Sequence, residues 1–237
     1  IKNATNLFYL VATLMGDKYK YRVPHILPFD STLSTTEDIA KSFVQNPKVL
    51  KWDEFTAMSE RYGWGQSTAI IIFDNLTRDN YYRISRTEYL RKDALILSSE
   101  EIIQISELLT AYLENKEYIG VWEMNFKSFP NIGYEWTVHL LESIVACYIK
   151  EYRIITPNYG SNKTERGLYV PCNSKLSTFD EVVLNVMKKN DRKMLTESEM
   201  YTMLVLSGVI KNSVPNELKE SKLISFKDGI YMIKESV

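Results

Sequence analysis

Two tripeptides in the sequence have the residue types of a metal-dependent nuclease site. The segments from Glu114 to Lys116 and from Glu220 to Lys222 both match the Glu-x-Lys ending of such a site. The same chemistry requires an aspartate on a preceding core strand, and neither tripeptide follows a convincing one. Because a fragment of a motif does not establish a site, we interpret both as surface sequence. We expect no catalytic residue and no hydrolytic activity from the chain alone.

The sequence lacks residues at the spacing that a metal site or a cofactor site requires. The only histidines are His25 and His139, and the two cysteines, Cys147 and Cys172, have no neighbour at metal-ligand spacing. The sequence also has no phosphate-cradling loop, no Gly-x-Ser-x-Gly and no His-Glu-x-x-His. We therefore expect neither a metal nor a cofactor. The low cysteine content predicts a reduced, cytoplasmic compartment.

The overall charge restricts how the chain could bind nucleic acid. It carries 29 Lys and Arg against 30 Asp and Glu, for a net charge of −1. Dedicated nucleic-acid binders often carry a positive excess, because neutralised phosphates release counterions. Any DNA-binding surface must therefore be a local group of basic residues on one part of the chain. The longest apolar stretches, such as residues 70–73, are too short to span a bilayer, so we expect no membrane partner.

Four capping boxes predict where helices begin. In each, a Ser or Thr is followed three residues later by Glu, which allows reciprocal hydrogen bonds with the first-turn backbone. The pairs are Ser34/Glu37, Ser98/Glu101, Thr178/Glu181 and Thr196/Glu199. Each pair leads into an apolar-periodic run, which makes the four matches a consistent pattern.

The C-terminal segment has the clearest order of elements. Apolar spacing predicts a helix through residues 182–187, a short strand at 193–195 and a second helix from Thr196 to near Gly208. A short third helix begins around Pro215. The sequence Asp228-Gly229 between two apolar runs then predicts a hairpin over residues 223–233.

The same order occurs earlier in the chain. Helices are expected at residues 36–44, 53–62 and 67–77, with a short strand at 49–50 and another beginning at Tyr81. Five matches lie at an offset of 145 residues and indicate an internal repeat. They are Leu50/Leu195, Glu54/Glu199, Phe55/Met200, Met58/Met203 and Gly63/Gly208.

A third copy fits between these two. Helices are expected at residues 99–113 and 135–149, a strand at 118–121, and paired strands at 153–155 and 167–170 across a long polar loop. Residues 1–35 fit none of this. A helix at 6–15 and a strand at 19–23 are expected there, and we interpret the segment as an N-terminal segment or linker.

The order helix, strand, helix, helix, hairpin resembles the winged helix-turn-helix superfamily. The resemblance implies a mainly α fold with small β-hairpins, that is an α+β class built from two or three tandem modules. The predicted modules span residues 36–97, 98–174 and 175–237. Tandem modules of this superfamily occur in transcription and replication factors, so the resemblance implies binding to double-stranded DNA by this chain or by a larger protein that contains it.

The resemblance also implies which residues contact DNA, because the second helix of the pair enters the major groove and the wing contacts the backbone or minor groove. In the first module these are Gln66, Ser67, Thr68, Asn75, Arg78, Arg83 and Arg86. In the middle module they are Thr137, His139, Asn162, Lys163 and Arg166. In the third they are Lys211, Asn212, Lys219, Lys222 and Lys227. Gln and Asn suit adenine edges, and Arg suits guanine or phosphate.

Other interpretations stay open. Four acidic residues lie on or near the proposed reading helices and would repel phosphates: Asp74, Glu142, Glu217 and Glu220. Winged helices that have lost their basic faces serve as protein–protein scaffolds. A further alternative is the DNA-reading accessory lobe of a nuclease or another DNA enzyme. Each predicted contact also has the simpler interpretation of a solvated surface side chain.

Aromatic residues could stack on bases or fill small cores. The candidates are Trp52, Trp64, Trp122, Trp136, Tyr81 and Tyr82. We favour the core interpretation, because large aromatic side chains dominate the energetics of small domains.

Overall fold

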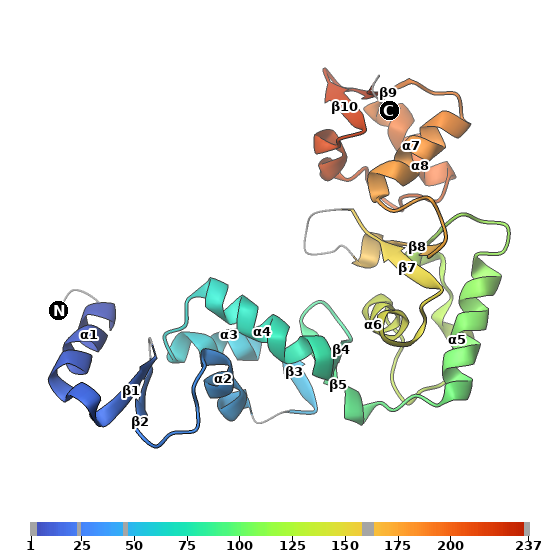
Figure 1. Cartoon of the computed structure of the whole chain (residues 1–237). Helices are drawn as coiled ribbons and strands as arrows, with labels where there is room; N and C mark the ends of the chain where they lie inside the picture. Colours follow the sequence, from blue (N-terminus) through green and yellow to red (C-terminus); the bar gives the residue numbers. More distant parts are fainter. Residues whose placement is uncertain (1–3, 23–24, 45–46, 158–163, 235–237) are drawn as a thin grey trace. The chain divides into compact units, whose positions relative to one another are not determined.

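A computed structural model describes residues 4–22, 25–44, 47–157 and 164–234 (Figure 1). The chain mixes helices with small antiparallel sheets of two or three strands. It divides into two compact units, residues 1–96 and 97–237. The division of the chain into four parts stays a prediction.

The first unit combines one two-stranded and one three-stranded sheet with four α-helices among its described residues. Its elements are α1 (Ala4–Met15), η1 (Gly16–Lys18), β1 (Tyr19–Arg22), β2 (His25–Pro28), α2 (Thr36–Val44), β3 (Val49–Lys51), α3 (Trp52–Arg61), α4 (Gln66–Asn80), β4 (Tyr81–Arg83), β5 (Glu88–Arg91) and η2 (Lys92–Ala94). The larger sheet has the order β3-β5-β4, so its last strand in sequence lies in the centre.

Aromatic rings fill the core of this unit. The Phe73 ring lies 5.1 Å from that of Phe55, 4.8 Å from that of Trp52 and 4.9 Å from that of Tyr89, measured between centroids. Trp64, Tyr81 and Tyr82 are also buried. The core interpretation of these aromatic residues is therefore confirmed. It also accounts for the one-sided burial of α4, because Phe73 faces inward from the middle of that helix.

The N-terminal hairpin packs onto the same core. The indole Nε1 of Trp64 donates a hydrogen bond to Nε2 of His25, and Leu27 packs against the core cluster. Strands β1 and β2 pair antiparallel from Tyr19 opposite Pro28 to Arg22 opposite His25. Part of the segment that we interpreted as a linker therefore contributes to the first unit.

We predict that acid weakens this attachment. Burial lowers the pKa of His25 below its ordinary value of 6.5, because the folded state favours the neutral imidazole that accepts the Trp64 bond. A group with a lowered folded pKa contributes stability that is complete above the unfolded pKa and is lost as the pH falls through the folded pKa. An NMR titration should place the His25 pKa below 6.5. Unfolding measurements against His25→Phe should show the wild-type advantage shrinking as the pH falls below the ordinary histidine pKa of 6.5 and through the lower pKa of the folded state. A His25 pKa at or above 6.5 would contradict this assignment.

The second unit contains two further three-stranded sheets with their helices. Its elements are α5 (Ser99–Tyr112), β6 (Ile119–Gly120), η3 (Val121–Glu123), η4 (Phe126–Ser128), α6 (Val138–Tyr148), β7 (Tyr152–Ile155), η5 (Thr164–Arg166), β8 (Leu168–Pro171), α7 (Phe179–Lys189), β9 (Met194–Thr196), α8 (Glu197–Leu206), η6 (Asn216–Glu220), β10 (Ile224–Lys227) and β11 (Ile230–Ile233). The sheet orders are β6-β8-β7 and β10-β11-β9. The hairpin predicted over residues 223–233 is confirmed.

Three of the four predicted capping boxes are confirmed, at Ser98, Thr178 and Thr196. The box predicted at Ser34/Glu37 is wrong by one residue. Oγ1 of Thr35 accepts the backbone N–H of Asp38, and the Asp38 carboxylate accepts the N–H of Thr35. These bonds hold the pKa of Asp38 at about 2. Adjacent Ser, Thr and acidic residues offer overlapping boxes here, and only packing selects between them.

Equivalent backbone hydrogen bonds occur in both copies, with an offset of 145 residues between Trp52 and Glu197 and of 142 residues at the last strand of each sheet. The N–H of Trp52 donates to the carbonyl of Thr87, and that of Glu197 donates to the carbonyl of Gly229. The amides of Arg91 and Ile233 likewise donate to the carbonyls of Lys48 and Lys193. In both copies, therefore, the start of the second helix is tied to the end of the hairpin loop.

A tyrosine occupies the same place in all three of these sheets. Each lies on the central strand, directly opposite an aliphatic residue of the first strand, in the pairs Tyr89/Leu50, Tyr169/Ile119 and Tyr231/Leu195. Burial raises the pKa of Tyr169 well above its ordinary value and that of Tyr231 to about 12. The middle segment, whose sequence match is weakest, therefore has the same strand pairing as the other two.

Part of the middle segment shares a hydrophobic core with the C-terminal segment. Ile155, Leu168 and Val170 of the middle segment belong to the same buried cluster as Phe179 and Val182 of the C-terminal segment. Polar contacts join the same parts. The hydroxyl of Tyr118 donates to the carbonyl of Ser207 at 2.9 Å, and the Glu117 carboxylate lies 2.7 Å from Nζ of Lys189. These two segments are packed as one body.

Helix α8 ends at a glycine that we predict to be essential for stability. Gly208 has φ = +67°, a conformation that costs an L-residue about 1–2 kcal/mol. A Cβ there would also lie 3.0 Å from Oε1 of Glu123. Gly208→Ala should lower the free energy of unfolding by at least about 1 kcal/mol in urea titrations. Lys211→Ala, an exposed substitution nearby, should change it by less than about 0.5 kcal/mol. Equal effects of the two would contradict this role of Gly208.

Candidate nucleic-acid interface

Helix α4 presents one buried and one exposed face. Ala69, Ile72, Phe73, Leu76 and Thr77 are buried against the core of the first unit. The opposite side begins with three exposed, uncharged polar residues, Gln66, Ser67 and Thr68. The N-cap is Gly65, and no side chain caps the helix. Because first-turn amides have no intrahelical acceptor, this end of α4 can donate to an outside anion.

The exposed face continues with two isoleucines that we did not predict as contact residues. Ile70 is 42% exposed and Ile71 is 61% exposed. The signal was present in the sequence, since residues 69–73 form an apolar run longer than one buried face requires. The first carboxylate on this face is that of Asp74. The first two turns of α4 are therefore uncharged.

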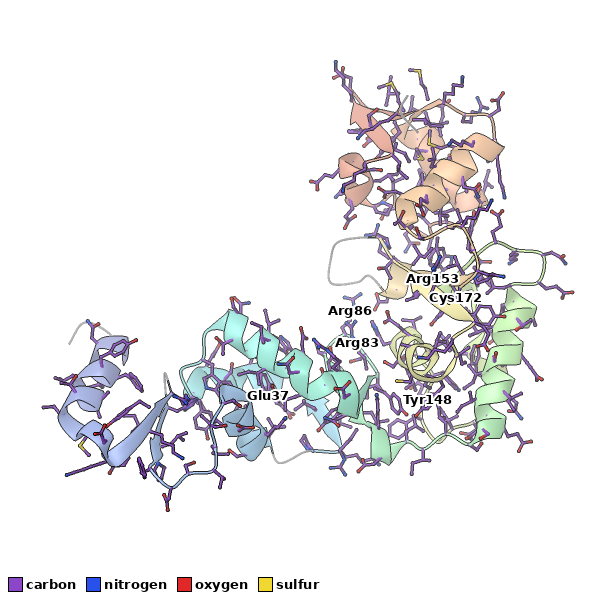
Figure 2. All side chains as sticks on the ribbon, in the orientation of Figure 1. Glu37, Arg83, Arg86, Tyr148, Arg153 and Cys172 are labelled. Carbon is purple, nitrogen blue, oxygen red and sulfur yellow. The ribbon has the colours of Figure 1, made fainter. Side chains whose placement is uncertain are left out.

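Two predicted contact residues lie toward the end of α4. Nδ2 of Asn75 lies 3.3 Å from Oε2 of Glu37, which also pairs with Lys41. Figure 2 labels Glu37 on α2. Arg78 is exposed in the last turn, where a cation is stabilised by the helix dipole. Asn75 is thus directed toward α2, and Arg78 has a stabilising role independent of any ligand.

The two predicted wing arginines, labelled in Figure 2, are Arg83 at the end of β4 and Arg86 in the loop between β4 and β5. Nε of Arg83 donates to the carbonyl of Ser85 at 3.0 Å, and Nη2 donates to the carbonyl of Arg86 at 3.2 Å. Oγ of Ser85 accepts the N–H groups of Thr87 and Glu88. Arg83 therefore shapes this turn, and Arg86 is the exposed cation of the loop.

The predicted contacts of the middle segment do not assemble into a surface. His139 is only 4% exposed and lies 3.6 Å from Oε1 of Glu165, so it belongs to the interior. Thr137 caps α6 by accepting the N–H of Leu140, which is why the helix begins at Val138 and not at residue 135. Arg166 is half-buried, and Asn162 and Lys163 lie outside the described residues. Helix α6 is buried on most sides, as its apolar composition requires.

The C-terminal segment lacks a full reading helix. The predicted third helix is the 3₁₀ turn η6, in which Pro215 occupies the N-cap. Nζ of Lys219 lies 2.7 Å from Oε1 of Glu197 and 4.4 Å from the centroid of the Phe226 ring. The remaining predicted contacts are exposed but come from separate places: Lys211 and Asn212 from the loop after α8, Lys222 from the turn before β10, and Lys227 from the end of β10.

An arginine that we did not predict is structural. Nη2 of Arg153 donates to the carbonyls of Ser174 and Leu176, and so joins β7 to the segment before α7. Its position inside an apolar strand is the sequence signal for such a role, because a cation there requires internal acceptors.

Comparison with known proteins adds no identification. No protein-family model matches this sequence, and neither does any curated protein. Within the described residues, no three His, Cys, Asp or Glu side chains form a group that could hold a metal ion. None of the helices described combines the length and the apolar character needed to cross a membrane.

We predict that Thr137 acts only through stability. Thr137→Ala removes the N-cap of α6 and should lower the free energy of unfolding by about 1 kcal/mol, whereas Thr137→Ser should restore most of it. Neither variant should change the affinity for duplex DNA in anisotropy titrations. If either variant loses affinity for DNA while its stability is unchanged, Thr137 contacts DNA and this prediction is wrong.

Proposed function

We propose that this chain is a DNA-recognition protein, or the recognition part of a larger one, that binds duplex DNA through α4 and the β4–β5 loop. In this proposal each three-stranded sheet with its helices is a winged-helix module. The element order α2, β3, α3, α4, β4, β5 and the sheet order β3-β5-β4 support this for residues 36–97. In such modules the helix equivalent to α4 enters the major groove, and the hairpin loop contacts the backbone or the minor groove.

The uncharged N-terminal half of α4 is the observation that carries the proposal. Its first two exposed turns contain hydroxyl, amide and aliphatic side chains and no carboxylate before Asp74. The positive end of the helix dipole favours phosphate oxygens at this end. Gln66 suits an adenine edge, Ser67 and Thr68 suit base edges or phosphates, and Ile71 suits a thymine methyl group.

The charge distribution supports the first unit as the DNA-binding part. Basic residues outnumber acidic residues in 1–96, whereas acidic residues outnumber basic residues in 97–237. Helix α6 buries His139 together with its apolar residues, and η6 has only five residues. We therefore propose that residues 97–237 do not bind DNA. We also propose that the chain acts without catalysis, metal or cofactor.

A salt titration with labelled duplex tests this function. With about two or three phosphate contacts from Arg86, Arg78 and the α4 N-terminus, log affinity should fall against log salt with a slope of about −2 to −3. Arg86→Ala should reduce the magnitude of that slope by about one and weaken all sequences alike. Ser67→Glu, which places a carboxylate at the open end of α4, should weaken binding at least tenfold.

Lys175→Ala is the matched control for this titration. Lys175 is exposed in the second unit, between β8 and α7, and its removal should leave both affinity and slope unchanged. If the wild type does not bind duplex at low ionic strength, the DNA proposal is wrong. If Lys175→Ala reduces the slope as much as Arg86→Ala, the DNA-binding surface is not confined to α4 and the β4–β5 loop.

A protein-scaffold function is the second candidate, and the exposure of Ile70 and Ile71 specifically favours it. Two neighbouring isoleucines on an uncharged helix face are also typical of a protein-binding surface. Under this alternative Ile71→Asp would abolish partner binding, and Arg86→Ala would have little effect. Under the DNA proposal both variants weaken binding to the same duplex.

A further inference from the structure

A groove of about 800 Å³ runs between the outer side of α5 and the turns that follow α6 and β8. Ala111, Leu113, Tyr152 and Pro171 give it an apolar floor. The hydroxyls of Thr110 and Tyr152 meet across it at 2.6 Å, which holds α5 against the start of β7. Cys172 lies at its edge, directly after β8, and is labelled in Figure 2. The groove lies wholly within the second unit and separate from the proposed DNA surface.

Three exposed carboxylates border this apolar floor. Glu107 comes from α5, Glu114 comes from the turn after the end of that helix, and Glu151 comes from the turn before β7. No ion pair or hydrogen bond of these three carboxylates is found among the described residues, and no lysine or arginine lines the groove. The groove therefore has a negative rim that the described part of the chain does not neutralise.

Two acidic residues of α5 lie on one side of the helix. Glu100 and Glu107 are seven residues apart, and Ile103 between them is 56% exposed. Glu114 follows in the turn after the end of the helix. A smaller groove that shares Glu107 and Ala111 continues along α5 toward Gln104 and Pro130. The apolar floor and the acidic rim therefore extend over several turns of this helix.

We propose that this groove binds a basic peptide segment of a partner protein, one that carries Arg or Lys on both sides of an apolar side chain. Charge complementarity selects this occupant. The carboxylates attract guanidinium or ammonium groups, and the apolar floor accepts the side chain between them. Duplex DNA would be repelled by the same rim and has no apolar side chain of this kind to insert. The chain would thus bind DNA and a protein partner with different units.

The carboxylates of the rim define a suitable probe. Glu107 lies on α5, Glu114 in the turn after its end and Glu151 in the turn before β7, so a basic segment must place its charges at separate points along the groove. A polyproline II segment rises about 3.1 Å per residue, so arginines about three positions apart lie about 9 Å apart. Repeated Arg-Pro-Leu tripeptides favour that conformation and place leucines between the arginines. A fluorescein-labelled peptide of this kind is the probe, and the same peptide with Glu in place of Arg is its control.

Two measurements on the full chain test the proposal. The basic peptide should bind at low ionic strength, and the control peptide should not. Combining Glu107→Gln with Glu114→Gln should weaken binding about three- to tenfold, because each exposed pair contributes modestly. Glu220→Gln, a matched exposed site outside the groove, should have no effect. Ala111→Arg, which fills the groove and adds a positive charge, should abolish binding.

The rate at which Cys172 is alkylated tests whether the peptide binds in this groove. Cys172 is exposed and Cys147 is only half-exposed, so maleimide should modify Cys172 first. The basic peptide should slow that modification, and duplex DNA should not. The proposal is wrong if the paired Glu→Gln substitutions leave peptide binding unchanged. It is also wrong if the bound peptide leaves the rate of Cys172 alkylation unchanged. If duplex DNA slows the modification of Cys172 and the peptide does not, the groove binds DNA and the proposal is also wrong.

Discussion

The insertion of the last strand of each repeat between the two earlier strands is the constraint on which this structure depends. It occurs in all three three-stranded sheets, with Tyr89, Tyr169 and Tyr231 at equivalent places. A central strand satisfies its backbone groups on both sides, so it fixes the hairpin and the first strand together. Where the second helix begins, as at Trp52 and Glu197, its amide is tied to the hairpin loop. These hydrogen bonds hold the start of α3 at the β4–β5 loop and the start of α8 at the β10–β11 loop.

The same scaffold has different consequences in the three repeats, because their third helices differ in composition. Helix α4 buries one side and leaves polar and aliphatic residues outside. Helix α6 buries His139 and its apolar neighbours, and its segment shares a core with the C-terminal one. In the C-terminal repeat the helix is reduced to η6. Helices α4 and α6 and the turn η6 therefore present unequal surfaces, and α4 has an exposed, uncharged face over its first two turns.

Local signals in the sequence predicted much of this architecture. Asp228-Gly229 fixed the last hairpin, and Thr178 and Thr196 marked helix starts, because each acts through bonds to its immediate neighbours. The contact residues were less predictable, because burial depends on distant packing. The resemblance implied that His139 contacts DNA, and only the tertiary fold shows that its side chain is buried. The core that strands β7 and β8 share with the C-terminal segment likewise depends on contacts between residues far apart in the sequence.

The central claim is that the first unit contacts DNA and the second does not, and backbone amide NMR on the full chain tests it most directly. Adding a short duplex at low ionic strength should shift the amide signals of residues 65–71 and of the loop at 84–87. Signals from α6 and from α5 should remain in place. Shifts confined to residues 97–237, or the absence of any shift, would contradict the account.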